Sequence, residues 1–167
     1  MKANLFLVAA LGAFLFSSCA KKTAPPASPS GPSYDDSYTL NGDGFKNVAY
    51  NISSVSTKSS SYDQTSNTTA IRIQGLSGDT LLVEYDITFV GNKAGTYTLG
   101  GSNNITLSNT SVKNQTTQVY TSDAGGKLII TGYGTTGSPI TGTFSGSYTN
   151  TGNSYTVSNG TFTATVQ

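Results

Sequence analysis

Apolar and polar residues alternate along much of the chain after residue 37, and this period of two predicts β-strands. The clearest segment is 80–90, where one face carries Leu81, Val83, Tyr85, Ile87 and Phe89. Its other face is polar, as expected for a strand with one side in a core and the other in water. Residues 77–79, Ser-Gly-Asp, form a turn signal before it, so 68–74 and 80–90 are predicted to make a β-hairpin.

A second long hairpin is predicted near the C-terminal end. Residues 140–149 alternate, residues 150–153 supply a turn, and a return strand begins at Tyr155. The apolar residues of the return strand change parity on either side of Asn159-Gly160. That pair is either a two-residue hairpin turn or a Gly bulge in one long strand. We favour the bulge, because the long preceding strand needs a partner of comparable length and one bulge returns both apolar sets to the core face.

Helical signals are almost absent after the apolar N-terminal segment, since no window combines apolar residues at helical spacing with capping residues. Many short strands separated by turns predict an all-β fold. We expect an antiparallel β-sandwich, with a β-barrel-like closed sheet as the alternative. The segment 38–167 is long enough for one domain with one core.

The N-terminal residues have the pattern of an export signal. An apolar run of twelve residues at 5–16 is shorter than the roughly 20 needed to span a bilayer and fits the core of a secretory signal. Residues 17–19, Ser-Ser-Cys, follow at once and resemble the bacterial lipobox, in which the Cys thiol is acylated and the chain is cleaved before it. We therefore expect a lipoprotein signal peptide at 1–18 and lipidation of Cys19.

The segment 19–37 holds four of the five prolines among Ala and Ser, and we expect it to be an extended tether. In the lipoprotein resemblance, the absence of Asp directly after the Cys favours the outer membrane. Lys21 and Lys22 stand where surface-exported lipoproteins often carry an acidic run, so the periplasmic face is favoured over the cell surface. The chain after cleavage has eight basic and eight acidic residues, so lipid rather than a basic patch must hold it to the membrane.

The amino-acid composition excludes several classes of functional site. The chain has no His, one Cys and one Glu, so it lacks the residues of a zinc site and the usual base of a catalytic triad. The formal net charge of +1 lacks the basic surplus of a nucleic-acid binder. We therefore expect no catalytic activity, no cofactor and no nucleic-acid partner. The 26 Thr, 23 Ser and 13 Asn residues are typical of a β-rich extracytoplasmic protein.

The C-terminal third contains three short motifs. They are Gly-Lys-Leu-Ile-Ile-Thr at 126–131, Ile-Thr-Gly-Thr-Phe-Ser at 140–145 and Ser-Asn-Gly-Thr-Phe at 158–162. Together with Gly-Thr-Tyr-Thr-Leu at 95–99 and the lipobox, they resemble Bacteroidetes-type envelope lipoproteins of unassigned function. The resemblance implies a single β-sandwich domain and an envelope location, and it brings no catalytic or binding residues.

Acidic residues in predicted loops are weak candidates for a calcium site, namely Asp43, Asp63 and Asp123. Residues 41–44, Asn-Gly-Asp-Gly, look like a fragment of a calcium loop, but the twelfth position is Ile52 where a Glu is needed. We favour a turn there, because Asn-Gly and Asp-Gly are turn chemistry, and we expect no metal.

Other polar residues are candidates for contact or modification. Glu84 and Asp86 share one strand face beside Arg72, and we favour a solvated cross-strand charge pair over a glycosidase pair. Four Tyr residues fall on apolar faces and are expected in the core: Tyr85, Tyr97, Tyr148 and Tyr155. Three others lie in polar surroundings and are candidates for ligand contact: Tyr34, Tyr38 and Tyr62. Asp-Thr-Leu at 79–81 resembles the acceptor motif of Bacteroidetes O-glycosylation, so Thr80 is a candidate site.

The sequence therefore predicts a non-catalytic, membrane-anchored envelope lipoprotein with a structural or binding role, whose partner is a glycan or an envelope protein. Two alternatives stay open: a glycan-binding accessory module for polysaccharide uptake, and a fimbrial or adhesive subunit joined to partners by strand addition. A long unprotected edge strand would favour the adhesive subunit. A shallow groove lined by Tyr and Asn would favour glycan binding.

Overall fold

The computed structural model describes residues 36–167, except the side chains of residues 54–56. The predicted signal peptide, the lipidation site Cys19 and the contact candidate Tyr34 lie outside these residues. The described part contains no helix, and thus none that could cross a membrane. Its eleven strands are β1 (Ser37–Gly42), β2 (Phe45–Asn51), β3 (Ser54–Asp63), β4 (Thr68–Ser77), β5 (Leu81–Val90), β6 (Gly95–Thr98), β7 (Asn104–Ser111), β8 (Thr117–Ser122), β9 (Lys127–Tyr133), β10 (Pro139–Asn150) and β11 (Asn153–Thr165).

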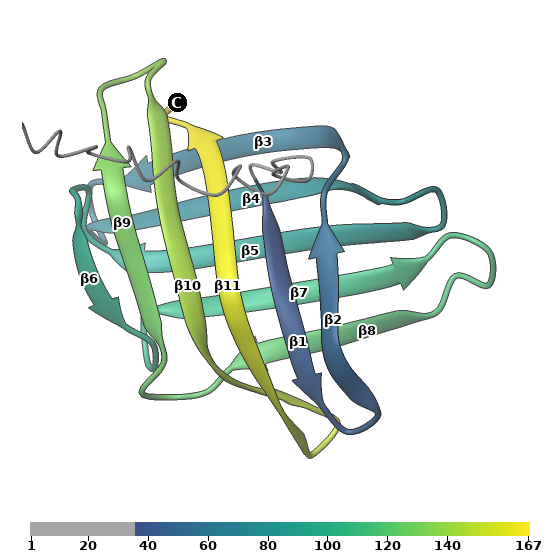
Figure 1. Cartoon of the computed structure of the whole chain (residues 1–167). Helices are drawn as coiled ribbons and strands as arrows, with labels where there is room; N and C mark the ends of the chain where they lie inside the picture. The colour runs from purple at the N-terminus through teal and green to yellow at the C-terminus, as the bar shows by residue number, and fades with distance from the viewer. Residues whose placement is uncertain (1–35) are drawn as a thin grey trace, which may run out of the picture. The chain divides into compact units, whose positions relative to one another are not determined.

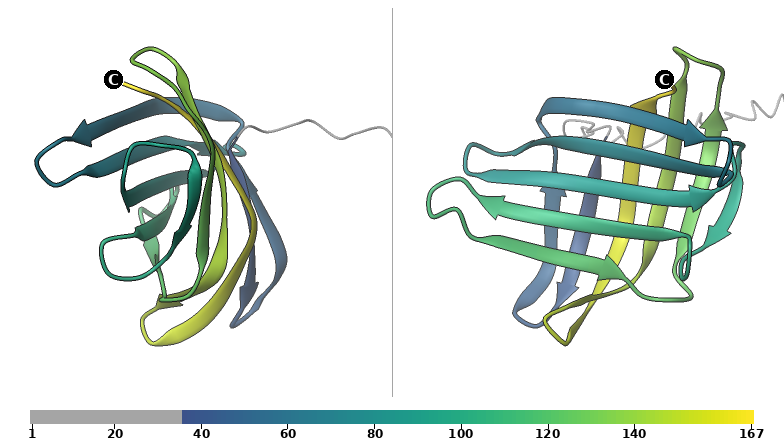
Figure 2. Two further views of the ribbon diagram at one scale, coloured as in Figure 1. Left: turned by 90° about the vertical axis from the view of Figure 1, so that its left-hand side faces the viewer. Right: turned by 180° about the vertical axis from the view of Figure 1, so that it is seen from behind.

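The strands form one antiparallel sheet that curls over itself into two layers (Figures 1 and 2). Along its main path the order is β2-β1-β11-β10-β8-β7-β5-β4-β3, while β9 pairs with β10 and β6 pairs with β9. In Figure 1 the front layer holds β9, β10, β11, β1 and β2, and the strands of the other layer run across behind it. The predicted all-β antiparallel fold is confirmed, with the two layers packed in the crossed manner of an orthogonal sandwich.

Strand β10 belongs to both layers. Its residues 140–145 pair with β9, whereas Tyr148 and Thr149 pair with β8. Between the two sets lies Gly146, where the register shifts and φ is 151°. A Cβ at Gly146 would come within 2.7 Å of the Gly126 Cα, so glycine allows the two backbones to approach where the strand leaves one layer for the other.

The predicted bulge in the last strand is confirmed. β11 runs unbroken from Asn153 to Thr165, and its register against β10 shifts beside Asn159, whose φ is 53°. Tyr155 and Val157 before the bulge are buried, as are Phe162 and Ala164 after it. Both apolar sets therefore face the core. The two predicted hairpins are confirmed as well, formed by β4 with β5 and by β10 with β11.

The core between the layers is rich in tyrosine. The largest fully buried side chains include Tyr38, Tyr85, Tyr120, Tyr148, Phe89 and Phe162. Tyr38 stacks on Tyr50 with ring centroids 4.9 Å apart and meets Tyr85 edge-on at 5.7 Å. Each tyrosine contributes a large apolar ring, but each also brings a hydroxyl that needs a hydrogen-bond partner. The core of this domain therefore contains polar atoms, and two of these hydroxyls, on Tyr85 and Tyr148, have no hydrogen-bond partner among the described residues.

A buried carboxylate joins the edge strand β3 to the opposite layer. Asp36 is 1% exposed, accepts a hydrogen bond from the Thr163 backbone N–H at 2.8 Å, and pairs with the Lys58 Nζ at 2.7 Å. Its carbonyl accepts from the Ile52 N–H at 2.9 Å. The domain thus includes Asp36 and Ser37, two residues that the sequence assigned to the tether.

Candidate functional site

An open hollow of about 190 Å³ lies between the layers where β2 faces the ends of β5, β7 and β8, strands that cross on the right-hand side of Figure 1. Its lining consists of Tyr50, Leu81, Asn109, Ser111, Thr116 and Gln118. None of the six is charged. The hollow is therefore a neutral site with one aromatic side chain, one aliphatic side chain and four polar ones.

The strand pattern explains why polar side chains, the buried Asn109 and the exposed Gln118, stand at the ends of inward rows here. On β7 the inward positions are Ile105, Leu107 and then Asn109, all buried. On β8 the inward row runs from Gln118 to the buried Tyr120. Because side chains alternate between the faces of a strand, each polar residue shares the face of its apolar neighbours and extends that row beyond the apolar core.

Two buried hydroxyls are satisfied by the amide side chains of the hollow. The Tyr38 hydroxyl donates to the Asn109 Oδ1 at 2.7 Å, and the Tyr120 hydroxyl donates to the Gln118 Oε1 at 2.7 Å. These bonds fix the orientation of both amides: the oxygen of each accepts, and the nitrogen, on the other arm of the same planar group, is left as a donor.

Asn109 carries an unsatisfied donor. The residue is 4% exposed, and its Nδ2 has no hydrogen-bond partner among residues 36–167. An unpaired buried donor costs about 1–3 kcal/mol, so such groups in native proteins usually meet a ligand or an ordered water. Asn109 lines the hollow, although its Nδ2 exposes almost no surface, so a molecule in the hollow can supply the missing acceptor once the side chains around the amide shift.

The phenols around the hollow are neutral donors. Burial raises the pKa of Tyr50 and, much more strongly, that of Tyr38, while the Asn109 side chain acts in the opposite direction on both. Burial also raises the pKa of Tyr120 to about 12. No lining group therefore titrates near neutral pH, and the arrangement suits hydrogen bonding to an uncharged ligand rather than proton transfer.

Two other hollows lie along the strands, away from the one at Asn109. One of about 340 Å³ follows β3, β4 and β5 beside Arg72 and Asp86, and one of about 470 Å³ follows β9, β10 and β11 beside Lys127 and Asn159. Neither is lined by a buried polar side chain without a partner. The remaining unpartnered buried atoms of the described chain, the hydroxyls of Tyr85 and Tyr148, line none of the three hollows. The hollow at Asn109 is thus the strongest candidate.

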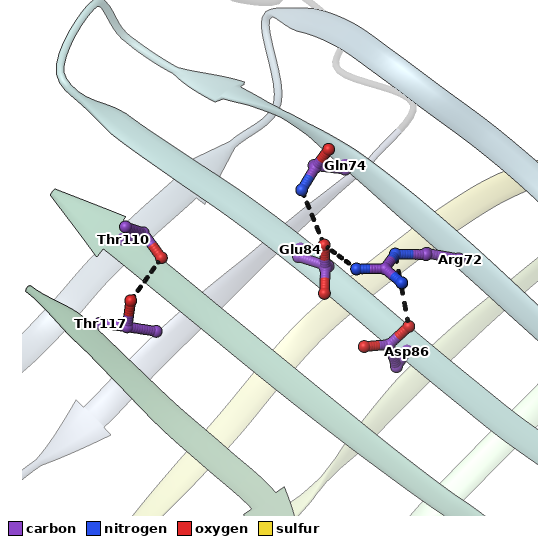
Figure 3. Close-up of polar contacts among 6 residues, drawn as sticks. All are labelled: Arg72, Gln74, Glu84, Asp86, Thr110 and Thr117. Atoms are coloured by element: carbon purple, nitrogen blue, oxygen red, sulfur yellow. Dashed lines mark hydrogen bonds and ion pairs between the residues drawn. The ribbon is translucent and has the colours of Figure 1, made fainter. Parts of the chain in front are cut away.

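The charged residues of the predicted hairpin lie on its outer face, as Figure 3 shows. The Arg72 Nη2 lies 2.7 Å from the Glu84 Oε2, and its Nε lies 3.9 Å from the Asp86 Oδ1. The Gln74 Nε2 also donates to the Glu84 Oε2 at 2.8 Å. Burial, with the Glu84 charge next, raises the pKa of Asp86, and Arg72 opposes this. The cross-strand charge pair is confirmed, and exposed pairs of this kind contribute little to stability.

The three calcium candidates lie in different loops. Asp43 accepts from the Asn153 Nδ2 at 2.8 Å, and Asp123 accepts from the Thr149 hydroxyl at 2.9 Å. Asp63 accepts from the Thr65 N–H and the Ser66 hydroxyl, and these hydrogen bonds lower its pKa. Among residues 36–167 no three His, Cys, Asp or Glu residues come together in a group that could hold a metal ion. The structure does not assemble the three aspartates into one site.

The prediction of Tyr38 as a ligand contact is wrong. Tyr38 is 1% exposed, because β1 alternates and places Tyr38 and Leu40 inward with Thr39 between them. Its polar neighbours in the sequence are the outward positions of the same strand. Tyr38 instead acts from the core, by holding Asn109.

The other two candidates within the described chain are at least partly exposed. Tyr62 is half-buried near the β3–β4 turn, and its hydroxyl donates to the Asn67 Oδ1 at 2.8 Å. Thr80 is exposed in the turn before β5, where its carbonyl accepts from the Val112 N–H. Its glycosylation stays a prediction, as does ligand contact by Tyr62.

None of the six lining residues was predicted from the sequence, although Asn109 and Gln118 could have been. Their signal is present, because each occupies the next inward place of a period-two row. In a chain so rich in Thr, Ser and Asn, however, a polar residue at the end of an inward row has the same sequence pattern as the start of a loop.

Comparisons with protein-family models, with curated proteins and with solved structures gave no significant match to the chain. The resemblance to Bacteroidetes-type envelope lipoproteins therefore stays a prediction from sequence motifs, and so does the location in the envelope.

Proposed function

We propose that this protein is a lipid-anchored, non-catalytic binding protein of a bacterial outer membrane, facing the periplasm, that holds an uncharged polar ligand between the layers of its sandwich. The lipobox-like residues 17–19 support the anchor, since they follow an apolar export segment directly. The anchor is acyl chains on Cys19, and two or more chains make such attachment stable.

The observation that carries the binding role is the unpartnered Asn109 Nδ2 beside an uncharged hollow. Binding of a neutral ligand requires only donors, acceptors and apolar surface, and the six lining residues supply these. Acid–base catalysis requires a group that titrates near the working pH. Among the six lining residues the one titratable group is the Tyr50 phenol, and burial raises its pKa. The proposed role is therefore binding without turnover.

The two ends of the main strand path, β3 and β2, do not favour an adhesive subunit that acts by strand addition. β3 ends one side of the main path, and its register against β4 shifts between Val55 and Thr57. Its Lys58 and Ser60 side chains are used within the domain, on Asp36 and on the Thr165 carbonyl. β2 ends the other side and has a register shift near its start, with Asn47 at a φ of 52°. Such irregularities hinder the docking of a further strand.

The proposal is tested on the acylated protein purified in detergent. Its melting temperature is measured with neutral oligosaccharides, polyols, uncharged peptides and their charged analogues. At least one neutral class should raise the melting temperature, because a ligand that binds only the folded state stabilises it. The effect should change little between low and moderate salt, since no charge lines the hollow. Stabilisation by charged analogues alone, with steep salt dependence, would contradict the proposal.

A further inference from the structure

We infer that the hollow at Asn109 binds a single ring of an uncharged carbohydrate, such as the end of a neutral glycan. This inference rests on the proposed binding function and adds the ligand class and the residues that recognise it. The argument depends on the size of the hollow, on the chemistry of its lining and on the fixed orientation of its amides.

The volume of the hollow suits one sugar ring. The hollow measures about 190 Å³, and an engineered cavity of about 150 Å³ in another protein is known to hold benzene. One six-membered ring with its substituents therefore fits, whereas a second ring must extend into solvent. Because the hollow is open, the rest of a longer chain can leave it without passing through the core.

The lining matches the two kinds of surface on a sugar ring. A pyranose has apolar C–H surface and a rim of hydroxyls, each of which both donates and accepts. Tyr50 and Leu81 provide apolar surface, and Tyr50 is held in place by its stack on Tyr38. Ser111 provides a hydroxyl that can donate and accept, and the Thr116 hydroxyl, which donates to the Asn114 Oδ1 at 2.7 Å, provides a further acceptor.

The two amides provide directional donors. The Asn109 Oδ1 accepts from the Tyr38 hydroxyl at 2.7 Å, while the Nδ2 hydrogens of the same amide have no partner among the described residues. The Gln118 Oε1 likewise accepts from the Tyr120 hydroxyl. A ligand hydroxyl that accepts from the Asn109 Nδ2 would satisfy the buried donor left unpaired in the described chain, which favours a ligand rich in acceptors.

Charged ligands fit less well. A carboxylate or an ammonium group in the hollow would lose hydration without meeting an opposite charge, because none of the lining residues is charged. Apolar ligands would leave the Asn109 Nδ2 unpaired. Water alone could satisfy the donor, and that outcome is tested directly.

The experiment uses the acylated protein in detergent and methyl glycosides of glucose, galactose and mannose as probes. Saturation-transfer NMR detects binding, and titration gives the dissociation constant, which for one ring with few polar contacts should be about 1 mM. Ser111→Phe places a ring in the mouth of the hollow, and Asn109→Ala removes the donor; each should weaken binding at least tenfold. Thr110→Ala is the matched control, because Thr110 neighbours both residues in sequence but lies on the outer face, where it bonds Thr117 (Figure 3).

The outcomes separate this inference from the proposed function. Loss of binding in Ser111→Phe and Asn109→Ala, with Thr110→Ala unchanged, supports the inference. If Asn109→Ala does not fold, Ser111→Phe still decides, since Ser111 is only half-buried at the end of β7. A neutral ligand that binds wild type and Ser111→Phe equally would overturn the inference and leave the binding function standing. Absence of saturation transfer from every probe means that water alone fills the hollow, and it would overturn the inference too, as would equal binding of methyl glucuronate.

Discussion

Replacing Phe162 with alanine tests the packing of the two layers. Phe162 is 1% exposed on β11, and its ring lies 6.4 Å from that of Phe144. Gly142 makes room for it, because a Cβ there would come within 2.5 Å of the Phe162 Cζ. Truncating a buried Phe to Ala costs about 3–5 kcal/mol, which is a large part of the roughly 5–15 kcal/mol that stabilises a domain.

The change is measured by urea unfolding of residues 33–167, which contain every residue of the core. With a urea dependence of about 2 kcal/mol per molar, a loss of about 4 kcal/mol lowers the midpoint by about 2 M. Thr163→Ala is the matched control, because Thr163 is one place along and only half-buried, and its hydrogen bond to Asp36 uses the backbone N–H. Its midpoint should fall by less than about 0.5 M. Equal losses in the two variants would refute the assignment of inward and outward faces after the bulge.

Three further predictions concern the anchor, the buried carboxylate and the tyrosines. Cys19→Ser should release the protein from membranes or leave a larger uncleaved precursor, and fatty-acid label retained in the variant would contradict acylation at this residue. Asp36→Ala should destabilise the domain by about 2–4 kcal/mol in the urea assay, because it leaves the Thr163 N–H unpaired and Lys58 without its partner; Asp36→Asn, which keeps an acceptor for Thr163, should cost less. Burial raises the pKa of Tyr148 strongly and that of Tyr120 to about 12. The folded state should therefore lose stability as the pH rises from the tyrosine pKa of the unfolded chain, near 10, through the raised pKa values of the folded state. Ultraviolet absorbance of phenolate during an alkaline titration should therefore rise with unfolding, and complete ionisation while the near-ultraviolet circular dichroism stays native would contradict the burial of these rings.

The local elements of this fold were predictable from the sequence because their signals are local. The hairpin of β4 and β5 follows from alternation on both sides of a Gly-containing turn, and the bulge at Asn159 follows from a change of parity in one strand. Strand order was not predictable in this way. The pairing of β10 with β8 joins residues that no turn connects, and it depends on the close approach of Gly146 to Gly126, which no period in the sequence reveals.

The candidate site was hidden for a different reason. In a chain with so many Thr, Ser and Asn residues, a polar residue at an inward position has the same appearance as a polar residue on the surface. The sequence around Asp36 predicts a tether, because its neighbours are those of a linker, yet Asp36 is buried and paired with Lys58 from a distant strand. The unpaired donor of Asn109 has no signal in the sequence, because only the three-dimensional structure brings Tyr38 to the Asn109 Oδ1 and leaves the Nδ2 unpaired.

The side-chain amide signal of Asn109 in a ¹H–¹⁵N spectrum tests the central claim most directly, because the assignment of the binding site to the hollow depends on that one donor. The signal is assigned by its loss in Asn109→Ala. Titration with the methyl glycoside that binds best should move the signal in proportion to occupancy and slow the exchange of its hydrogens with water, while the Asn104 amide, outside the hollow, should stay in place. An Asn109 signal that does not move when the ligand is saturating would contradict binding at the hollow.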